Sequence, residues 1–200
     1  MFKLKVSDWD VYYLHSYIPI GEWGIANPND RRLSDKILKY KHGGDFEIRL
    51  FTHKLMKSIS YLSNHIIDDE NDKLALVSIP PSETDKFSPI QESINIIEEK
   101  YRKTDFNCSK EILNPHLLTR ISDVTSAHLE GPRPTYHNHM DTISFNRDFI
   151  FDDTTAFILI DDITTTGTIM DACEDILIKN NIDEKSIYKL AISKTVHCND

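Results

Sequence analysis

Cysteine is scarce in this 200-residue chain, and the cysteines present do not have the spacing of a metal site or a disulfide framework. Cys108, Cys173 and Cys198 are odd in number and widely separated, and no Cys-x-x-Cys motif occurs. Such a set argues against a zinc ribbon and against a small disulfide-bonded secreted domain. We therefore expect free thiols in the reducing cytoplasm.

Long apolar runs are also absent. None approaches the roughly 18 residues needed to cross a bilayer, and the N-terminal stretch MFKLKVSDWDVYY is too polar for a signal peptide. Hydrophobic residues make up 40% of the chain and charged residues 28%, which is ordinary for a soluble globular protein. We expect a soluble cytoplasmic protein with no membrane partner. The net charge of -9 argues against a protein that coats nucleic acid nonspecifically.

No internal repeat, low-complexity tract or linker divides the chain, so we expect one domain over residues 1–200. Apolar periodicity predicts alternating strands and helices. The expected strands lie at 11–20, within 73–82, at 156–160 and at 187–192, and the expected helices at 33–40, 51–66, from 89 to about 101 and up to about 179. Ser88 and Gln91 form a predicted capping box at the start of the third helix.

The order of these elements predicts the α/β class, with a central, mostly parallel sheet flanked by helices. The run KLALVSIPPS is apolar throughout, which suits a strand buried on both faces of a parallel sheet. The last strand–helix–strand unit has the length of a right-handed parallel crossover. Residues 123–141 are polar and are broken by glycine and prolines, so we expect a long mobile loop there.

One stretch, AFILIDDITTTGTIMDACEDIL at residues 156–177, carries the strongest chemical signal. Asp161 and Asp162 follow an apolar strand, where ionised groups need a partner. Adjacent carboxylates can accept hydrogen bonds from the vicinal hydroxyls of a ribose. The following Thr165–Thr168 segment enters a helix, whose free amides and dipole attract a phosphate. A sugar phosphate therefore suits this segment. The loop at 80–88 is expected beside it, beyond the carboxyl ends of the strands.

Other phosphate-binding motifs are missing. The chain contains no GxxxxGK[ST] sequence, so a P-loop is unsupported, and no GxGxxG sequence, so a dinucleotide-binding fold is disfavoured. The tripeptide His137–His139 does not make an HNH nuclease, and no second ligand group accompanies it at metal-binding spacing.

The segment FILIDDITTTGT resembles the phosphoribosyl pyrophosphate (PRPP) signature of the type I phosphoribosyltransferases: four apolar residues, two acids and a threonine-rich phosphate loop. Thr164 stands where that family usually has an aliphatic residue, and Ile169 stands where a hydroxyl often contacts the phosphate. The segments KILKYKHGGD, LVSIPPS and RISDVT resemble, in the same order, segments of the ComF-like branch. The N-terminal zinc ribbon of that branch is missing. The chain therefore resembles a divergent, ribbon-less relative of it.

This resemblance implies a type I phosphoribosyltransferase fold with a small N-terminal hood at roughly residues 1–32. It also implies displacement of pyrophosphate from PRPP with Mg²⁺ as cofactor. Asp161 and Asp162 would be catalytic and would hold the metal and the ribose hydroxyls. The substrate would be bound by Thr164, Thr165, Thr166, Gly167 and Thr168 and by the pyrophosphate loop, Pro81, Ser82 and Glu83.

The same resemblance assigns a cationic group on the mobile loop to the leaving pyrophosphate. Arg133 is the expected catalytic residue there, and Arg120 is a second candidate for reaching the site. Lys86 is the only cation of the pyrophosphate loop.

The resemblance leaves two functions open. The leading one is a magnesium-dependent phosphoribosyltransferase whose acceptor is unknown. The alternative is a catalytically weak PRPP or nucleotide sensor, acting as partner or effector in a DNA-uptake or phage-defence module. A homodimer and a protein partner of this kind rest on analogy alone.

Overall fold

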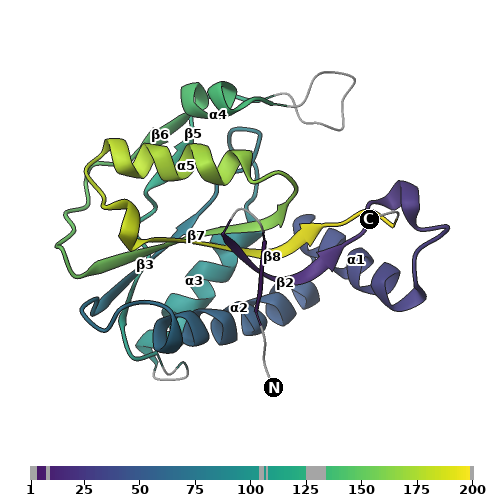
Figure 1. Ribbon diagram of the computed structural model, residues 1–200, viewed down its shortest axis with the longest axis horizontal. Coiled ribbons are helices and arrows are strands. Elements are labelled where there is room, and N and C mark those ends of the chain that lie inside the picture. The colour runs from purple at the N-terminus through teal and green to yellow at the C-terminus, as the bar shows by residue number, and fades with distance from the viewer. Residues whose placement is uncertain (1–3, 8–9, 104–105, 107, 125–133, 199–200) are drawn as a thin grey trace.

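The computed structural model describes residues 4–7, 10–103, 106, 108–124 and 134–198 (Figure 1). In chain order the elements are β1 (Lys5–Val6), β2 (Val11–Tyr17), the 3-10 turn η1 (Ile20–Glu22), α1 (Pro28–Lys41), α2 (Asp45–His65), β3 (Lys73–Ser78), α3 (Pro89–Arg102), β4 (Glu111–Leu113), β5 (Leu118–Arg120), α4 (Tyr136–Thr142), β6 (Ile143–Phe145), β7 (Thr155–Thr164), α5 (Thr168–Lys179), the 3-10 turn η2 (Glu184–Ser186) and β8 (Ile187–Thr195).

Six strands form the central sheet in the order β1-β2-β8-β7-β3-β4. All neighbouring pairs in it run parallel except β1 and β2, and β5 and β6 form a separate antiparallel pair. The expected α/β fold with a mostly parallel sheet flanked by helices is therefore confirmed. The sequence does not predict the short strands β4, β5 and β6, because they contain no long apolar run.

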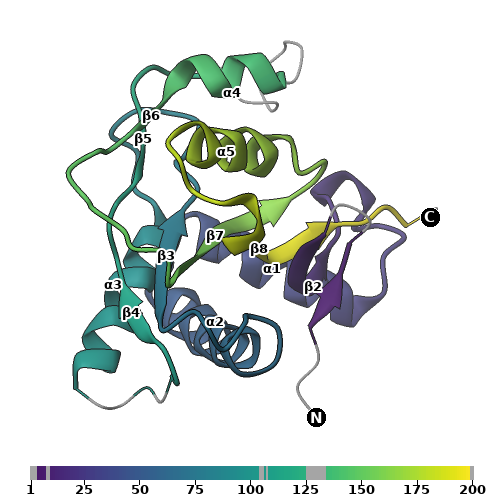
Figure 2. The ribbon, with the colours of Figure 1, turned by 60° about the vertical axis from the view of Figure 1, so that its left-hand side comes forward.

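Helices cover both faces of the sheet, with α1, α2 and α3 on one side and α4 and α5 on the other (Figure 2). Alternate residues of each central strand serve the two cores, because successive side chains of a strand point to opposite faces. On β3, Leu74 and Leu76 pack in the core with α1–α3, whereas Ala75 and Val77 pack in the core with α5. This double burial explains the continuous apolar run of β3.

The helix boundaries follow local capping more than apolar periodicity. Helix α1 begins at Pro28 instead of the expected Leu33, because Asn27 caps it: the Asn27 side chain accepts a hydrogen bond from Asn29 N at 2.9 Å. Ser88 caps α3 as expected and accepts from Gln91 N at 3.1 Å. Gln91 Nε2 donates to Asn95 and Asn114, and the described residues show no hydrogen bond from Ser88 N to the Gln91 side chain, so the reciprocal half of the predicted capping box does not form.

The expected mobile loop at 123–141 is wrong for its last part. Residues 136–141 belong to α4, whose start is fixed by a capping box between Thr135 and Asn138. A hydroxyl and an amide that satisfy each other's backbone donors can begin a helix in a polar sequence without an apolar stripe. Residues 125–133 lie outside the described part of the chain.

Part of the segment expected as a small hood, at roughly residues 1–32, belongs to the central sheet. Strand β2 pairs in parallel with β8 over most of its length, so it extends the central sheet. Residues 18–27 and α1 lie beyond it, at the end of the sheet where β2, β7 and β8 finish (Figure 1). This shorter segment is positioned to cover a site at the carboxyl ends of these strands.

A buried polar network joins α1, α2 and α3. The Tyr40 hydroxyl donates to Pro89 O at 3.0 Å and lies 2.9 Å from Ser93 Oγ, which also accepts from Thr52 Oγ1 at 2.9 Å. Tyr40, Thr52 and Ser93 are all buried. Because each hydroxyl is bonded, the network fixes the C-terminal end of α1 against the other helices.

Replacing Tyr40 by Phe should lower the free energy of unfolding by about 1–2 kcal/mol, because the carbonyl of Pro89 loses its buried donor. Urea denaturation measures this loss. Tyr101→Phe, a partly buried tyrosine of α3 whose hydroxyl has no hydrogen bond within the described chain, is the matched control. Equal losses in the two variants would contradict a role for the network.

Candidate functional site

The acid pair lies inside a strand and not in a loop. Strand β7 continues to Thr164, four residues beyond its expected end, because β8 pairs with it as far as Thr164. On its other side β3 ends at Ser78, opposite Ile160. Asp161 and Asp162 therefore stand on a one-sided extension of the sheet, next to the point where the chain leaves β3.

The strand backbone restrains both carboxylates. Asp161 Oδ1 accepts a hydrogen bond from Asp162 N at 2.8 Å, and Asp162 Oδ1 accepts from Ile163 N at 2.6 Å. Ser193 Oγ on β8 donates to Asp162 O at 3.2 Å. Each carboxylate thus uses one oxygen within the strand, and both side chains are half-buried.

Burial and the neighbouring Asp162 carboxylate raise the pKa of Asp161, and Lys41 opposes this rise. Two adjacent carboxylates of this kind resist ionising together unless a cation is near. The acid pair can therefore be stabilised by a bound cation or by hydrogen bonds with the hydroxyl groups of a ligand.

Lys41, an exposed residue, lies within electrostatic reach of the acids but forms no ion pair with them in the described part of the chain. It is the last residue of α1, and Asp162 raises its pKa, with a further contribution from Asp161. Tyr17, at the end of β2, also lies within electrostatic reach of Lys41 and Asp162. Lys41 lies in the segment KILKYKHGGD. The sequence does not indicate a role for it at this site, because 120 positions separate it from the acids.

The threonine-rich loop has the geometry of an anion cradle. Gly167 caps α5 with a positive φ of 79°, a conformation that favours glycine, and no side chain bonds the first-turn amides from the cap position. The hydroxyls of Thr166 and Thr168 lie 2.7 Å apart, and Thr165 Oγ1 lies 3.1 Å from Thr195 Oγ1 on β8. Thr168 N donates to Thr166 Oγ1 at 3.5 Å, so an anion in front of α5 would meet the next amides of the first turn and the exposed Thr165 and Thr166.

Thr164 does not belong to this cradle. Its side chain is only 2% exposed, and its hydroxyl has no hydrogen-bond partner within the described residues. Thr164, which the resemblance assigns to substrate binding, thus occupies a buried position at the end of β7, apart from the exposed threonines.

The expected pyrophosphate loop begins beside the acids, where Ile79 N donates to Ile160 O at 2.9 Å. Pro81 and Ser82 are half-buried, and Glu83 is exposed. Lys86 forms an ion pair with Glu83 at 2.5 Å, so the only cation of this loop already has a carboxylate partner.

Residues 120–124, from the segment RISDVT of the resemblance, hold this loop in place. Arg120 Nε donates to Pro81 O at 2.8 Å, and Val124 N donates to Ser82 O at 2.8 Å. Asp123 Oδ1 accepts from Thr84 N at 2.6 Å and from Thr84 Oγ1 at 2.8 Å. These hydrogen bonds keep the loop in one conformation beside the acid pair.

Arg120 is consequently a buried scaffold residue. Its second nitrogen donates to Thr142 Oγ1 on α4 at 2.5 Å, and the side chain is 6% exposed. Arg133, the expected cation for the leaving group, lies outside the described residues. Within the described residues no group of three or more His, Cys, Asp and Glu side chains could hold a metal ion.

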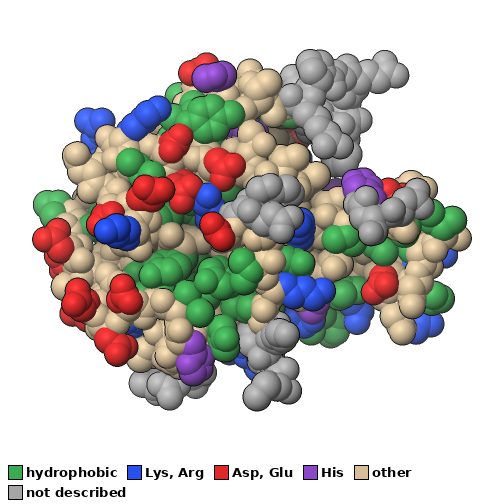
Figure 3. Space-filling model, viewed as in Figure 1, with side chains coloured by type: hydrophobic (Ala, Val, Ile, Leu, Met, Phe, Trp, Pro, Cys, Tyr) green, Lys and Arg blue, Asp and Glu red, His purple; other side chains and the backbone are tan. Residues whose placement is uncertain are grey.

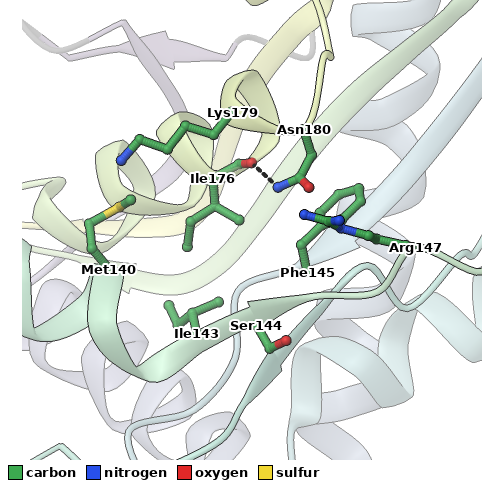
Figure 4. A pocket seen from close by; sticks show the side chains of 8 residues that line it. All are labelled: Met140, Ile143, Ser144, Phe145, Arg147, Ile176, Lys179 and Asn180. Atoms are coloured by element: carbon green, nitrogen blue, oxygen red, sulfur yellow. Dashed lines mark hydrogen bonds between the residues drawn. The ribbon is translucent and has the colours of Figure 1, made fainter.

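A surface hollow of about 470 Å³ lies at the opposite end of α5 from the acid pair (Figure 4). Arg147 and Lys179 flank its mouth, and the hollow is lined by Met140, Ile143, Ser144, Phe145, Arg147, Ile176, Lys179 and Asn180. None of the expected site residues lines it, so it is not part of the candidate site.

No protein-family model and no curated protein matches this chain. Among the described residues, no helix is both long enough and apolar enough to cross a membrane. Function therefore has to be argued from the acid pair, its cation and the two neighbouring loops.

Asp161→Asn should raise stability, and more so at about pH 8 than at about pH 5. A carboxyl group whose pKa is higher in the folded than in the unfolded chain binds its proton more tightly when folded, so stability falls as pH rises through that window. The asparagine variant lacks this loss, and its free energy of unfolding should exceed that of the wild type by about 1–3 kcal/mol at the higher pH.

Thermal melting at both pH values measures the effect, and Asp148→Asn, an exposed aspartate, is the control. A clear loss of melting temperature in Asp161→Asn at both pH values would show instead that this carboxylate holds the fold together.

Proposed function

We propose that this protein binds PRPP or a related ribose 5-phosphate compound and, with Mg²⁺, transfers or releases its phosphoribosyl group. The observation that carries the proposal is the continuous path from Asp161 and Asp162 on β7 to the glycine-capped start of α5. Within seven residues this path offers acceptors for ribose hydroxyls and donors for a phosphate.

The neighbouring groups support the same ligand. The loop at 80–88, held by Arg120 and Asp123, lies next to the acids on the side where β3 has ended. Lys41 places one positive charge beside the two carboxylates. A ligand with a diol at its centre and phosphates at both ends would use the acids, the α5 cradle and this loop together.

Asp161 and Asp162 suit Mg²⁺, because carboxylate oxygens are ligands that this ion prefers. One oxygen of each carboxylate is taken by a backbone amide, which leaves the other for a metal or a hydroxyl. Mg²⁺ is usually bound by one or two carboxylates together with substrate phosphates, so a pair is a sufficient protein contribution. When bound, the ion would neutralise charge on the pyrophosphate as it leaves.

In the proposed reaction the bond between the anomeric carbon and the pyrophosphate oxygen breaks, and its electron pair leaves with pyrophosphate. The acceptor forms the new bond to that carbon and releases its proton to the medium. The protein positions the reactants: the acids orient the ribose, and the amides of α5 hold the 5'-phosphate still. Lys41 limits the mutual repulsion of the acids while the site is open.

One observation favours the second candidate, a PRPP or nucleotide sensor with little turnover. The Lys86–Glu83 ion pair leaves the loop without a free cation for the leaving group, and Glu83 adds a negative charge beside it. Leaving-group stabilisation by positive charge is a large part of catalysis in phosphate chemistry. A protein without it would bind the ligand but turn it over slowly.

Pyrophosphate release separates the two candidates. The protein, PRPP and Mg²⁺ are incubated with a panel of nucleobases, and pyrophosphate is measured over time. We expect release that falls about a hundredfold in Asp162→Asn, because one preorganised polar group is lost. Binding of PRPP by calorimetry without release selects the sensor. Absence of both binding and release would overturn the proposed function.

Thr166→Val tests the phosphate cradle. The substitution removes one hydroxyl with little change in shape, and a hydrogen bond to a charged group contributes about 1.5–3 kcal/mol. Affinity for ribose 5-phosphate should therefore fall roughly ten- to a hundredfold, whereas binding of ribose stays the same. Thr119→Val, an exposed threonine on β5, is the matched control. An unchanged affinity for the phosphorylated sugar would move the phosphate away from this loop.

A further inference from the structure

Positive charge is concentrated in one part of an acidic protein. Residues 28–65, which include α1 and α2, hold eight Lys and Arg against four Asp and Glu, whereas the whole chain has a net charge of -9. On the face shown in Figure 3, Lys and Arg side chains predominate around β2 and α1, and most Asp and Glu side chains lie toward the other end of the molecule.

Four basic side chains from four elements lie within electrostatic reach of His15 or Lys54, and we call them the basic cluster: Lys5 on β1, His15 on β2, Lys36 on α1 and Lys54 on α2. At its centre the Lys54 ammonium group donates to His15 Nε2 at 2.6 Å. Phe51 supports both groups, with the His15 ring edge-on at 6.1 Å and Lys54 Nζ 5.4 Å from the ring centroid.

The other two members surround this pair. Lys5 Nζ lies 3.4 Å from Ser16 Oγ and 5.6 Å from the centroid of the Tyr13 ring. Burial, then Lys54, then Lys5 lower the pKa of His15 to about 4, and burial followed by Lys36 lowers the pKa of Lys54. The four groups therefore act on one another electrostatically, and His15 is held in its neutral form at neutral pH.

These lysines are among the Lys and Arg residues that form no ion pair with a carboxylate in the described part of the chain, whereas six others do. Carboxylates pair with Lys39, Lys73, Lys86, Arg102, Lys103 and Lys189. In the part of the chain that the structure describes, no carboxylate forms an ion pair with Lys5, Lys36 or Lys54. In a chain with 32 Asp and Glu against 23 Lys and Arg, acids to neutralise this cluster are abundant elsewhere. Positive charges gathered on one surface raise the local concentration of anions there.

We propose that the basic cluster binds a small, multiply charged phosphate compound of the pyrophosphate or phosphate-monoester class. Three lysines and a protonatable imidazole match the two or three negative charges of such a group, and lysine binds phosphate as a point charge. A polymer is disfavoured because the net charge of -9 repels a long polyanion. The site is made of β1, β2, α1 and α2 and does not depend on the function proposed for the acid pair.

The test observes His15 directly, by nuclear magnetic resonance of its imidazole during titration with pyrophosphate in the absence of magnesium. Bound pyrophosphate should raise the pKa of His15, because it compensates the positive charges of Lys54 and Lys5. By linkage, pyrophosphate should bind more tightly as the pH falls toward that raised pKa. No movement of the His15 signals at high pyrophosphate concentration would overturn the proposal.

In Lys54→Met the affinity for pyrophosphate, read from the His15 shift, should fall about ten- to a hundredfold. Loss of one charged hydrogen-bond donor has an effect of this size. Lys36 is exposed, so Lys36→Met is less disruptive to the fold, and it should also lower the affinity for pyrophosphate. Lys100→Met removes one exposed charge from α3 and should leave the shift unchanged. Equal shifts in the Lys54 and Lys100 variants would contradict the site.

Two further titrations separate this site from its alternatives. In the Thr166→Val variant the His15 response should persist, since the candidate phosphate cradle at α5 is a different part of the chain. Loss of that response would mean that one site explains both effects, and it would overturn the proposal. A short single-stranded oligonucleotide that moves the His15 signals where pyrophosphate does not would likewise overturn it in favour of nucleic acid.

Discussion

Strand β7 extends four residues beyond the end of β3, and the arrangement of the candidate site follows from this difference. Beyond Ile160 only β8 pairs with β7, so the backbone at Asp161 and Asp162 is held from one side and open on the other. A strand holds side chains more rigidly than a loop does, because its amides are committed to a ladder. The two acids are therefore presented to a ligand by the sheet itself, and the loop begins only after Thr164.

Neighbouring groups offset the electrostatic repulsion between the two adjacent carboxylates. Each accepts a backbone amide of the next residue, and Lys41 adds a positive charge from α1. Lys41 in turn depends on the buried hydroxyl network of Tyr40, Ser93 and Thr52, which fixes the end of its helix. The electrostatics of the site are thus coupled to a core contact between α1, α2 and α3.

Hydrogen bonds from residues 120–124 hold the loop after β3 in place. Arg120, Asp123 and Val124 supply its hydrogen bonds, and Arg120 also reaches Thr142 on α4. The strand–loop unit at 118–124 and helix α4 therefore form one layer over the candidate pyrophosphate loop. Their own positions depend on the apolar contacts of Leu118 and Ile143 with the core around α5.

Local physics determined much of this protein from sequence alone. A continuous apolar run predicted the buried β3, Ser88 before Pro89 predicted the start of α3, and the threonine-rich segment with Gly167 predicted the start of a helix there. Each of these features depends on residues within one turn or one strand. The same reasoning placed the acids and the α5 cradle beside the loop after β3, because parallel strands end at a common edge.

Tertiary structure alone decided the rest. The length of β7 depends on its partner β8, the start of α4 on a reciprocal polar cap in an apolar-poor segment, and the burial of Thr164 on packing at the end of the strand. Lys41 comes within electrostatic reach of Asp162 across 121 positions of sequence, and Lys54 forms a hydrogen bond with His15 across 39. Charge–charge contacts leave no periodic trace in a sequence, since they depend on distance in space and not on spacing along the chain.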